Sequence, residues 1–208
     1  MTEPPETMIG PPETEEPRRR DASRRAILEA TQALLLEGGS ERISIRRVSD
    51  RCGFKAPTIY HHFRDKTGLI DALIEERFAE LLARLQRVPR HVDPAQYLRA
   101  LARAFVEFGL ENPSHYALLT APRLNPDEQL PSAEAARELV FGALAEVART
   151  GALRTPDLES AFQLTWVVLH GVLSLRISRP SYAWSGDLVE LALDVIERGL
   201  LGKETVAP

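Results

Sequence analysis

One short segment of the chain carries residue types and spacings that are suited to binding nucleic acid. In the stretch VSDRCGFKAPTIYHHF, which covers residues 48–63, Ser49, Gly53 and Ile59 lie at positions i, i+4 and i+10. Two closely crossing helices need a small residue at the crossing, a glycine that accepts positive φ in the turn, and an apolar anchor on the second helix. The pattern therefore predicts a helix-turn-helix from about Ser44 to Phe63, whose second helix would lie in the major groove of DNA.

The charges of the chain are divided unevenly along its length, although the formal net charge is only -4. Residues 18–66 hold twelve Lys and Arg against six Asp and Glu, whereas residues 67–208 hold fourteen against nineteen. Residues 1–17 hold five Glu and no Lys or Arg. A basic segment joined to an acidic remainder is expected when one part of a protein meets phosphate and the other does not.

Caps, helix breakers and apolar spacing predict an all-α fold with an N-terminal three-helix helix-turn-helix domain and a C-terminal helical bundle. The first three helices are expected at about 18–38, 44–53 and 56–63, and Pro57 suits a first helical turn. Asp65 would cap a fourth helix that ends near Arg87. Further helices are expected at about 94–111, after Pro113, and at 132–149, 157–178 and 186–201, which gives roughly nine in all.

The predicted domains follow from this pattern. Residues 1–17 are rich in Pro and Glu and are interpreted as a disordered tail, because they cannot bury enough apolar surface. The helix-turn-helix domain would cover 18–66 and a second domain 67–203, with a short tail at 204–208. The helix from about Lys66 to Arg87 would join the two domains.

Composition and motifs argue against several other classes of protein. The single cysteine, Cys52, excludes an intrachain disulfide framework and a multi-cysteine zinc site. It is interpreted as a small buried residue rather than a redox sensor.

No apolar run approaches the roughly 20 residues of a membrane helix, and the acidic N-terminus does not resemble a signal peptide, so we expect a cytoplasmic protein with no membrane partner. His61 and His62 point apart on a helix, so no metal site is expected there. Known catalytic and cofactor-binding motifs are absent from the sequence, and we expect neither an enzyme nor a cofactor.

The segment from about Arg24 to Leu73 resembles the DNA-binding domain of the tetracycline-repressor (TetR) family of transcriptional regulators. That family shows a small residue, Thr, an aliphatic residue, Tyr, two positions that are often His or Tyr, and Phe, followed closely by Lys. This chain reads PTIYHHF at 57–63 and then Lys66. Phe54 and Lys55 stand where Val and Ser are more usual.

The resemblance implies roles for individual residues. Ser44 would offer its hydroxyl and backbone N–H to phosphate, residues 55–58 would meet the groove, and Lys66 would add charge at a helix N-terminus. Residues 18–20 would form a basic arm along the DNA backbone or in the minor groove, unless they are an ordinary solvated charge run. The predicted DNA-contacting residues are Arg18, Arg19, Arg20, Arg24, Ser44, Arg46, Lys55, Ala56, Pro57, Thr58, Tyr60, His61 and Lys66.

The second half resembles the variable ligand-binding and dimerisation domain of the same family. Trp166 and His170 are four residues apart and share a helix face, and with Gly171 they are similar to a Trp, His, Gly signature found in a subset of members. The predicted ligand-binding residues are Phe105, Phe108, Tyr116, Trp166 and His170. Alternatively, His170 is a core histidine bonded to a backbone carbonyl.

These observations lead to the hypothesis of a homodimeric regulator of double-stranded DNA. It would be a repressor that leaves a palindromic operator when a small molecule binds the second domain, although an activator would show the same sequence pattern. One alternative is a ligandless or co-regulator-dependent DNA-binding protein with a solidly packed second domain. The other is an enzyme or a small-molecule carrier in which the helix-turn-helix is only a packing unit.

Overall fold

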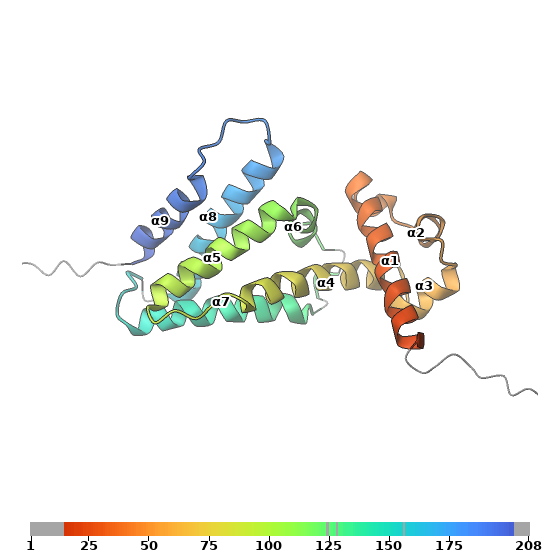
Figure 1. Ribbon diagram of the computed structural model, residues 1–208, viewed down its shortest axis with the longest axis horizontal. Coiled ribbons are helices and arrows are strands. Elements are labelled where there is room, and N and C mark those ends of the chain that lie inside the picture. The colour runs from red at the N-terminus through yellow and green to blue at the C-terminus, as the bar shows by residue number, and fades with distance from the viewer. Residues whose placement is uncertain (1–14, 124, 128, 156, 202–208) are drawn as a thin grey trace, which may run out of the picture. The chain divides into compact units, whose positions relative to one another are not determined.

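The computed structural model describes residues 15–123, 125–127, 129–155 and 157–201, and within them the chain is helical (Figure 1). The described residues form nine α-helices and one short 3₁₀ helix and contain no β-strand, which confirms the predicted all-α class. The elements are α1 (Glu15–Gly38), η1 (Ser40–Arg42), α2 (Ile45–Cys52), α3 (Ala56–Phe63), α4 (Lys66–Gln86), α5 (Pro94–Glu111), α6 (Pro113–Leu119), α7 (Pro131–Arg149), α8 (Leu158–Ser178) and α9 (Leu188–Leu200).

Local residue chemistry explains where several helices begin and end. The Ser44 hydroxyl accepts a hydrogen bond from the Arg47 amide at 3.3 Å and caps α2. Gly53 ends α2 in the left-handed region, with φ of 76°. The Asp157 carboxylate accepts from the Glu159 amide at 3.1 Å and caps α8. The caps expected at positions 44, 53 and 157 are therefore all present.

The chain divides into two compact units, and the boundary falls after Leu73, inside α4. It lies seven residues beyond the boundary predicted from the sequence. In the first unit, α1 contacts both α2 and α3, and α2 contacts α3. With the start of α4 and the connection before α2, these helices bury an aliphatic core with one aromatic ring, formed by Ile27, Leu28, Ile43, Val48, Ile59, Phe63, Leu69 and Ile70.

The first helix differs from the sequence prediction at its start. It begins at Glu15, so residues 15–17 of the predicted tail are helical, while residues 1–14 and the predicted C-terminal tail at 204–208 lie outside the described residues. Pro17 is tolerated because it lies in the first turn, where its missing N–H has no partner to lose. Residues 18–20 consequently form an exposed part of a helix and not an extended arm.

In the second unit, α5 is the central helix. It contacts α6, α7, α8 and α9, and α8 also contacts α7 and α9 (Figure 1). The core between them is mainly aliphatic and includes Leu85, Leu101, Val106, Leu144 and Leu173. Gly109 allows α5 and α8 to approach closely, because a Cβ at this position would lie 2.7 Å from the Leu173 side chain.

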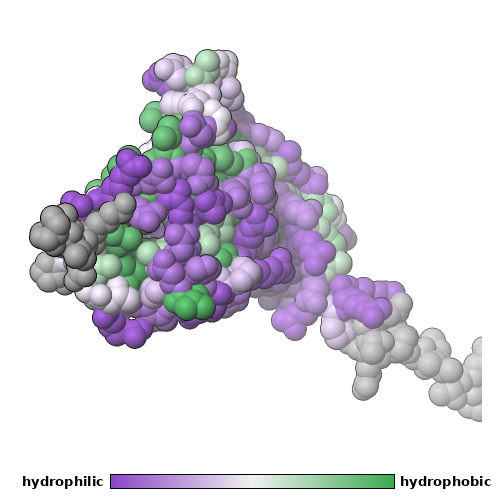
Figure 2. All heavy atoms as spheres, turned by 60° about the vertical axis from the view of Figure 1, so that its left-hand side comes forward, coloured by the Kyte–Doolittle hydropathy of each residue, from purple (hydrophilic) through white to green (hydrophobic). Residues whose placement is uncertain are grey.

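Helix α8 is apolar on more than one face. It buries Ala161, Leu169 and Leu173, yet it exposes Leu164 and Val167 to solvent. By length and composition alone α8 would suffice to cross a membrane, although no run of this kind was predicted from the sequence. A core helix of a soluble protein meets the same criteria. Figure 2 shows that hydrophobic residues reach the surface between hydrophilic ones over the second unit.

Candidate DNA-binding site

The turn between α2 and α3 is fixed by contacts among a few small residues. The Ser49 hydroxyl donates a 2.7 Å hydrogen bond to the Phe54 carbonyl, and the Gly53 amide donates to the Ser49 carbonyl at 2.9 Å. Val48 and Ile59 have no exposed surface. Ser49 therefore does more than allow the helices to cross, because its hydroxyl also closes the turn. The partly buried Cys52 lies at the end of α2, with its Sγ 3.9 Å from the Ser49 carbonyl.

The face of α3 opposite this core carries the residues predicted to meet DNA. Lys55, Pro57, Tyr60 and His61 are exposed, and Tyr60 shows half of its surface to solvent. Ala56 and Thr58 are half-buried in the first turn. Lys55 occupies the N-cap position but its side chain does not cap the helix. The N-cap and the exposed face of α3 thus present a cation, Lys55, and an aromatic hydroxyl, that of Tyr60.

The other predicted DNA-contacting residues fall into two groups. Ser44 and Arg46 are exposed at the start of α2, and Lys66 is half-buried at the start of α4. Because the Ser44 oxygen accepts from the helix amide, its hydroxyl proton is available to a phosphate. Arg24 differs from these, since its guanidinium carbon lies 5.6 Å from the centre of the Phe63 ring and contributes to packing.

His62 connects α3 to α1, a role that the sequence did not suggest. Its Nε2 lies 2.9 Å from the Ser23 hydroxyl oxygen, and that hydroxyl donates its single proton to the Arg20 carbonyl at 2.9 Å. The oxygen can therefore only accept from the imidazole, which places a proton on Nε2. Burial, followed by the charges of His61, Arg20 and Arg24, lowers the pKa of His62.

The link between α3 and α4 contains an unusual backbone conformation. Arg64 has φ of 58° and ψ of -56°, and it is the one non-glycine residue with positive φ among the described residues. The Asp65 amide donates a 2.6 Å hydrogen bond to the Phe63 carbonyl across it. An i to i+2 hydrogen bond with these dihedral angles is a γ-turn of the rarer, strained kind.

In the second unit, three of the predicted ligand-binding residues surround a fourth. The rings of Phe105, Tyr116 and Trp166 lie 5.2, 5.5 and 4.8 Å from the His170 ring. The Tyr116 hydroxyl lies 3.0 Å from His170 Nδ1 and 3.3 Å from the His170 carbonyl. Burial lowers the pKa of His170 and raises the pKa of Tyr116. Phe108 does not join this cluster, because its ring instead lies 6.2 Å from that of His115.

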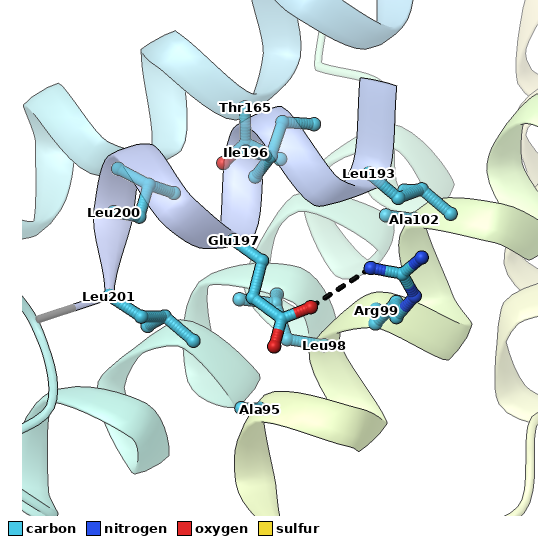
Figure 3. Close-up of a pocket in the computed structure, with 10 residues that line it drawn as sticks. All are labelled: Ala95, Leu98, Arg99, Ala102, Thr165, Leu193, Ile196, Glu197, Leu200 and Leu201. Atoms are coloured by element: carbon cyan, nitrogen blue, oxygen red, sulfur yellow. Dashed lines mark hydrogen bonds and ion pairs between the residues drawn. The ribbon is translucent and has the colours of Figure 1, made fainter. Parts of the chain in front are cut away.

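A small crevice lies elsewhere in the same unit, between α5, α8 and α9 (Figure 3). Its walls are mainly apolar and include Leu98, Ala102 and Ile196. Figure 3 shows the Arg99 guanidinium and the Glu197 carboxylate at its edge, and these groups are 2.9 Å apart. The cavity volume is about 30 Å³, which is enough for one or two water molecules. Among the described residues no group of His, Cys, Asp and Glu could hold a metal ion.

Two family models match the chain. Residues 27–73 match the model described as bacterial regulatory proteins, tetR family, and residues 98–198 match the model of a tetracyclin repressor-like C-terminal domain. The first match covers the helix-turn-helix and the start of α4, and the second covers most of the bundle.

Curated relatives match over part of their length. A tetracycline repressor protein class A from transposon 1721 of Escherichia coli is 36% identical over 80 residues, which are 38% of this chain and 36% of that protein. Nucleoid occlusion factor SlmA of Glaesserella parasuis is 28% identical over 112 residues, which are 53% of this chain and 56% of that protein. The matched stretch thus spans between about a third and somewhat more than half of these relatives.

Solved structures match over most of the chain. A TetR family transcription regulator from Marinobacter aquaeolei VT8 has a TM-score of 0.75 at 18% identity. The match covers 89% of this chain and 99% of the Marinobacter chain. A protein with unknown function from Rhodococcus sp. RHA1 has a TM-score of 0.71 at 26% identity, and the match covers 86% of this chain and 96% of the Rhodococcus chain. Both share the arrangement of helices.

Proposed function

Because this chain belongs to the tetR family of bacterial regulatory proteins, we propose that it is a homodimeric transcriptional regulator that binds a palindromic operator in double-stranded DNA. In this proposal it is a repressor, and a small molecule bound in the second unit releases it from the operator. It acts in the cytoplasm and performs no catalysis. The observation that carries the proposal is the exposed face of α3, with Lys55 at its N-cap and Tyr60 and His61 along it, on a closed helix-turn-helix.

The contacts of the first unit divide into two kinds in this proposal. Ser44, Arg46 and Lys66 neutralise phosphates and position the protein, whereas the exposed residues of α3 reach base edges. Two recognition helices of a dimer would enter successive major grooves about one helical turn apart. The predominance of Lys and Arg in 18–66 supports this assignment despite the acidic total.

The exposed apolar residues of α8 and α9 support a dimer. Leu164, Val167 and Leu175 recur along α8, and Leu191 and Val195 are four residues apart on α9, so that each set shares a helix face. Each of these side chains is between 47% and 63% exposed. Covering such residues with a second copy of the chain would remove apolar surface from water.

The cluster around His170 is the proposed effector site. Its Nδ1 is engaged by Tyr116, while the exposed Trp166 forms one side of the cluster. Because α4 contributes residues to both units, it is the proposed lever between effector and DNA. Thermodynamic linkage requires that an effector which weakens DNA binding is itself bound more weakly, by the same factor, when DNA is present.

Salt-titrated DNA binding tests the proposal. A duplex selected by the protein from a random-sequence pool should bind tightly at low salt and lose affinity steeply as salt rises, because phosphate contacts release counterions. Tyr60→Ala and Lys66→Ala should weaken binding without loss of helical structure, while Arg149→Ala, at an exposed position of the second unit, should bind as the wild type does. Failure of the wild type to bind any duplex at low salt would overturn the proposal.

A ligandless or co-regulator-dependent DNA-binding protein is the second candidate function. The crevice between α5, α8 and α9, with a volume of about 30 Å³, is too small to serve as an alternative effector pocket. The partial match to a nucleoid occlusion factor is in keeping with a role beyond effector-controlled repression. Ultrafiltered cell extract separates the two, because only an effector-controlled repressor would release DNA when given the small-molecule fraction alone.

A further inference from the structure

We propose that Arg64 contacts a DNA phosphate and that the strained turn fixes the backbone position from which its side chain reaches that phosphate. Arg64 was not among the residues that the sequence singled out. The inference rests on the proposed DNA-binding function and adds one positioning contact to it. It depends on three features of the segment 63–68: a strained backbone, a fixed geometry and an exposed cation.

The backbone of Arg64 is in a conformation that a side chain disfavours. With φ of 58° and ψ of -56°, the residue is the centre of a γ-turn closed by the Asp65 amide and the Phe63 carbonyl at 2.6 Å. Glycine would adopt positive φ without a Cβ penalty, so an arginine here makes the folded first unit less stable. Strained residues of this kind persist where the surrounding structure enforces them, and they cluster at functional sites.

Neighbouring contacts hold the turn in this geometry. The Asp65 carboxylate accepts a 2.8 Å hydrogen bond from the Gly68 amide and so caps the start of α4. A Cβ on Gly68 would lie 2.6 Å from the Phe63 carbonyl oxygen, so the first turn of α4 approaches the end of α3 as closely as a backbone can. The turn is therefore fixed from both sides, and the Arg64 backbone cannot relax without moving α3 or α4.

The charge pattern explains why a cation is needed at this position. Helix N-termini attract phosphate, but the N-terminus of α4 already carries the negative charge of Asp65. Lys66 offsets that charge, and Arg64 on the other side of Asp65 makes the segment cationic. The Arg64 side chain is exposed and makes no hydrogen bond or ion pair with any part of the chain that the structure describes. Its five N–H donors are consequently available to a phosphate.

Charge and strain are distinguished by separate measurements, the salt dependence of DNA binding for the charge and amide exchange for the strain. Arg64→Gly removes both, and Arg64→Lys removes neither, while Arg149→Gln removes an exposed arginine from the second unit as a control. DNA affinity is measured against salt with the selected duplex and with an unrelated duplex. Opening of α3 is measured by amide hydrogen exchange over residues 56–63, because both tryptophans lie in the second unit and do not report on the first.

The expected results combine weaker binding with a more stable first unit. Arg64→Gly should lower the slope of log affinity against log salt by about 0.9 per protomer on both duplexes, since a phosphate contact carries no sequence information. It should also slow amide exchange in α3. Arg64→Lys should keep the wild-type slope and exchange rate, and the control should match the wild type in DNA binding.

Three outcomes overturn the inference. If Arg64→Gly keeps the wild-type salt slope, the arginine makes no phosphate contact. If Arg64→Gly speeds amide exchange in α3, the turn is not strained. If the wild type binds no duplex at low salt, the proposed function fails and this inference fails with it, so the first two results are distinguished from a failure of DNA binding itself.

Discussion

Helix α9 is attached to α5 by an ionic network whose contribution to stability can be measured. Arg103 donates two hydrogen bonds of 2.7 Å to the Glu190 carboxylate, and Arg99 donates to Glu190 at 2.8 Å. Arg99 also bonds Asp194 and Glu197 on the same helix. We predict that Glu190→Gln destabilises the second unit at neutral pH and makes its stability less dependent on pH.

The magnitude follows from the pKa of Glu190. Hydrogen bonds from Arg103 and then Arg99 lower this pKa from 4.5 to about 2. At about 1.36 kcal/mol per pKa unit the shift would correspond to about 3.4 kcal/mol. The Glu190 side chain is 46% exposed, so solvent screening reduces its contribution to about 1 kcal/mol. The unfolded state binds the proton more tightly, so this stabilisation is complete above the unfolded pKa and is lost as pH falls from 4.5 towards 2.

Urea unfolding followed by the fluorescence of Trp166 and Trp184 measures this effect, because both lie in the second unit. At fixed protein concentration, Glu190→Gln should lower the free energy of unfolding by about 1 kcal/mol at neutral pH, and the difference from wild type should shrink by at least half near pH 3. Glu138→Gln, an exposed glutamate of α7, is the matched control and should leave stability unchanged. An equal free energy of unfolding for wild type and Glu190→Gln at neutral pH, or a difference that persists in acid, would refute the reasoning.

Two further substitutions test the helix-turn-helix and the aromatic cluster. Gly53→Ala should speed amide exchange in α2 and α3 about fivefold, because it forces φ of 76° on an L-residue at a cost of about 1 kcal/mol. The same change at Gly142, inside α7 with open space for a Cβ, should instead stabilise the second unit by about 0.5–1 kcal/mol. If both substitutions stabilised the protein, or both destabilised it, this explanation would be contradicted. Tyr116→Phe removes the hydroxyl that bonds His170 and should cost the second unit about 1 kcal/mol in urea unfolding, with unchanged affinity for DNA in the absence of an effector. An unaltered unfolding midpoint would mean that the hydroxyl contributes nothing to the folded unit.

The sequence by itself determined the helix-turn-helix and the all-α class. Ser44, Gly53 and Ile59 act on residues within a few positions along the chain, as cap, turn and anchor. Such short-range effects depend on side-chain type and spacing, which a sequence displays directly. The division into a basic segment and an acidic remainder is likewise a property of residue order and needs no coordinates.

Most residues of the proposed effector site could also be predicted from the sequence, but the contacts that each of them makes could not. The structure places His170 in contact with Phe105, Tyr116 and Trp166. The ring of Phe108 instead contacts His115 on α6. Aromatic residues on one amphipathic helix are all candidates for a pocket, and only the packing of α5 against α6 and α8 decides which ring faces which helix.

Only the tertiary structure decided the contacts between residues far apart in the chain. Arg99 and Glu197 are 98 residues apart in the chain, and Ser23 and His62 are 39 residues apart. No local sequence pattern can therefore predict that either pair is in contact. The strained turn at Arg64 is similar, because its dihedral angles result from the meeting of α3 with α4 and not from a preference of arginine. Short-range chemistry thus sets where helices begin, turn and end, while long-range packing sets which charged and aromatic side chains meet.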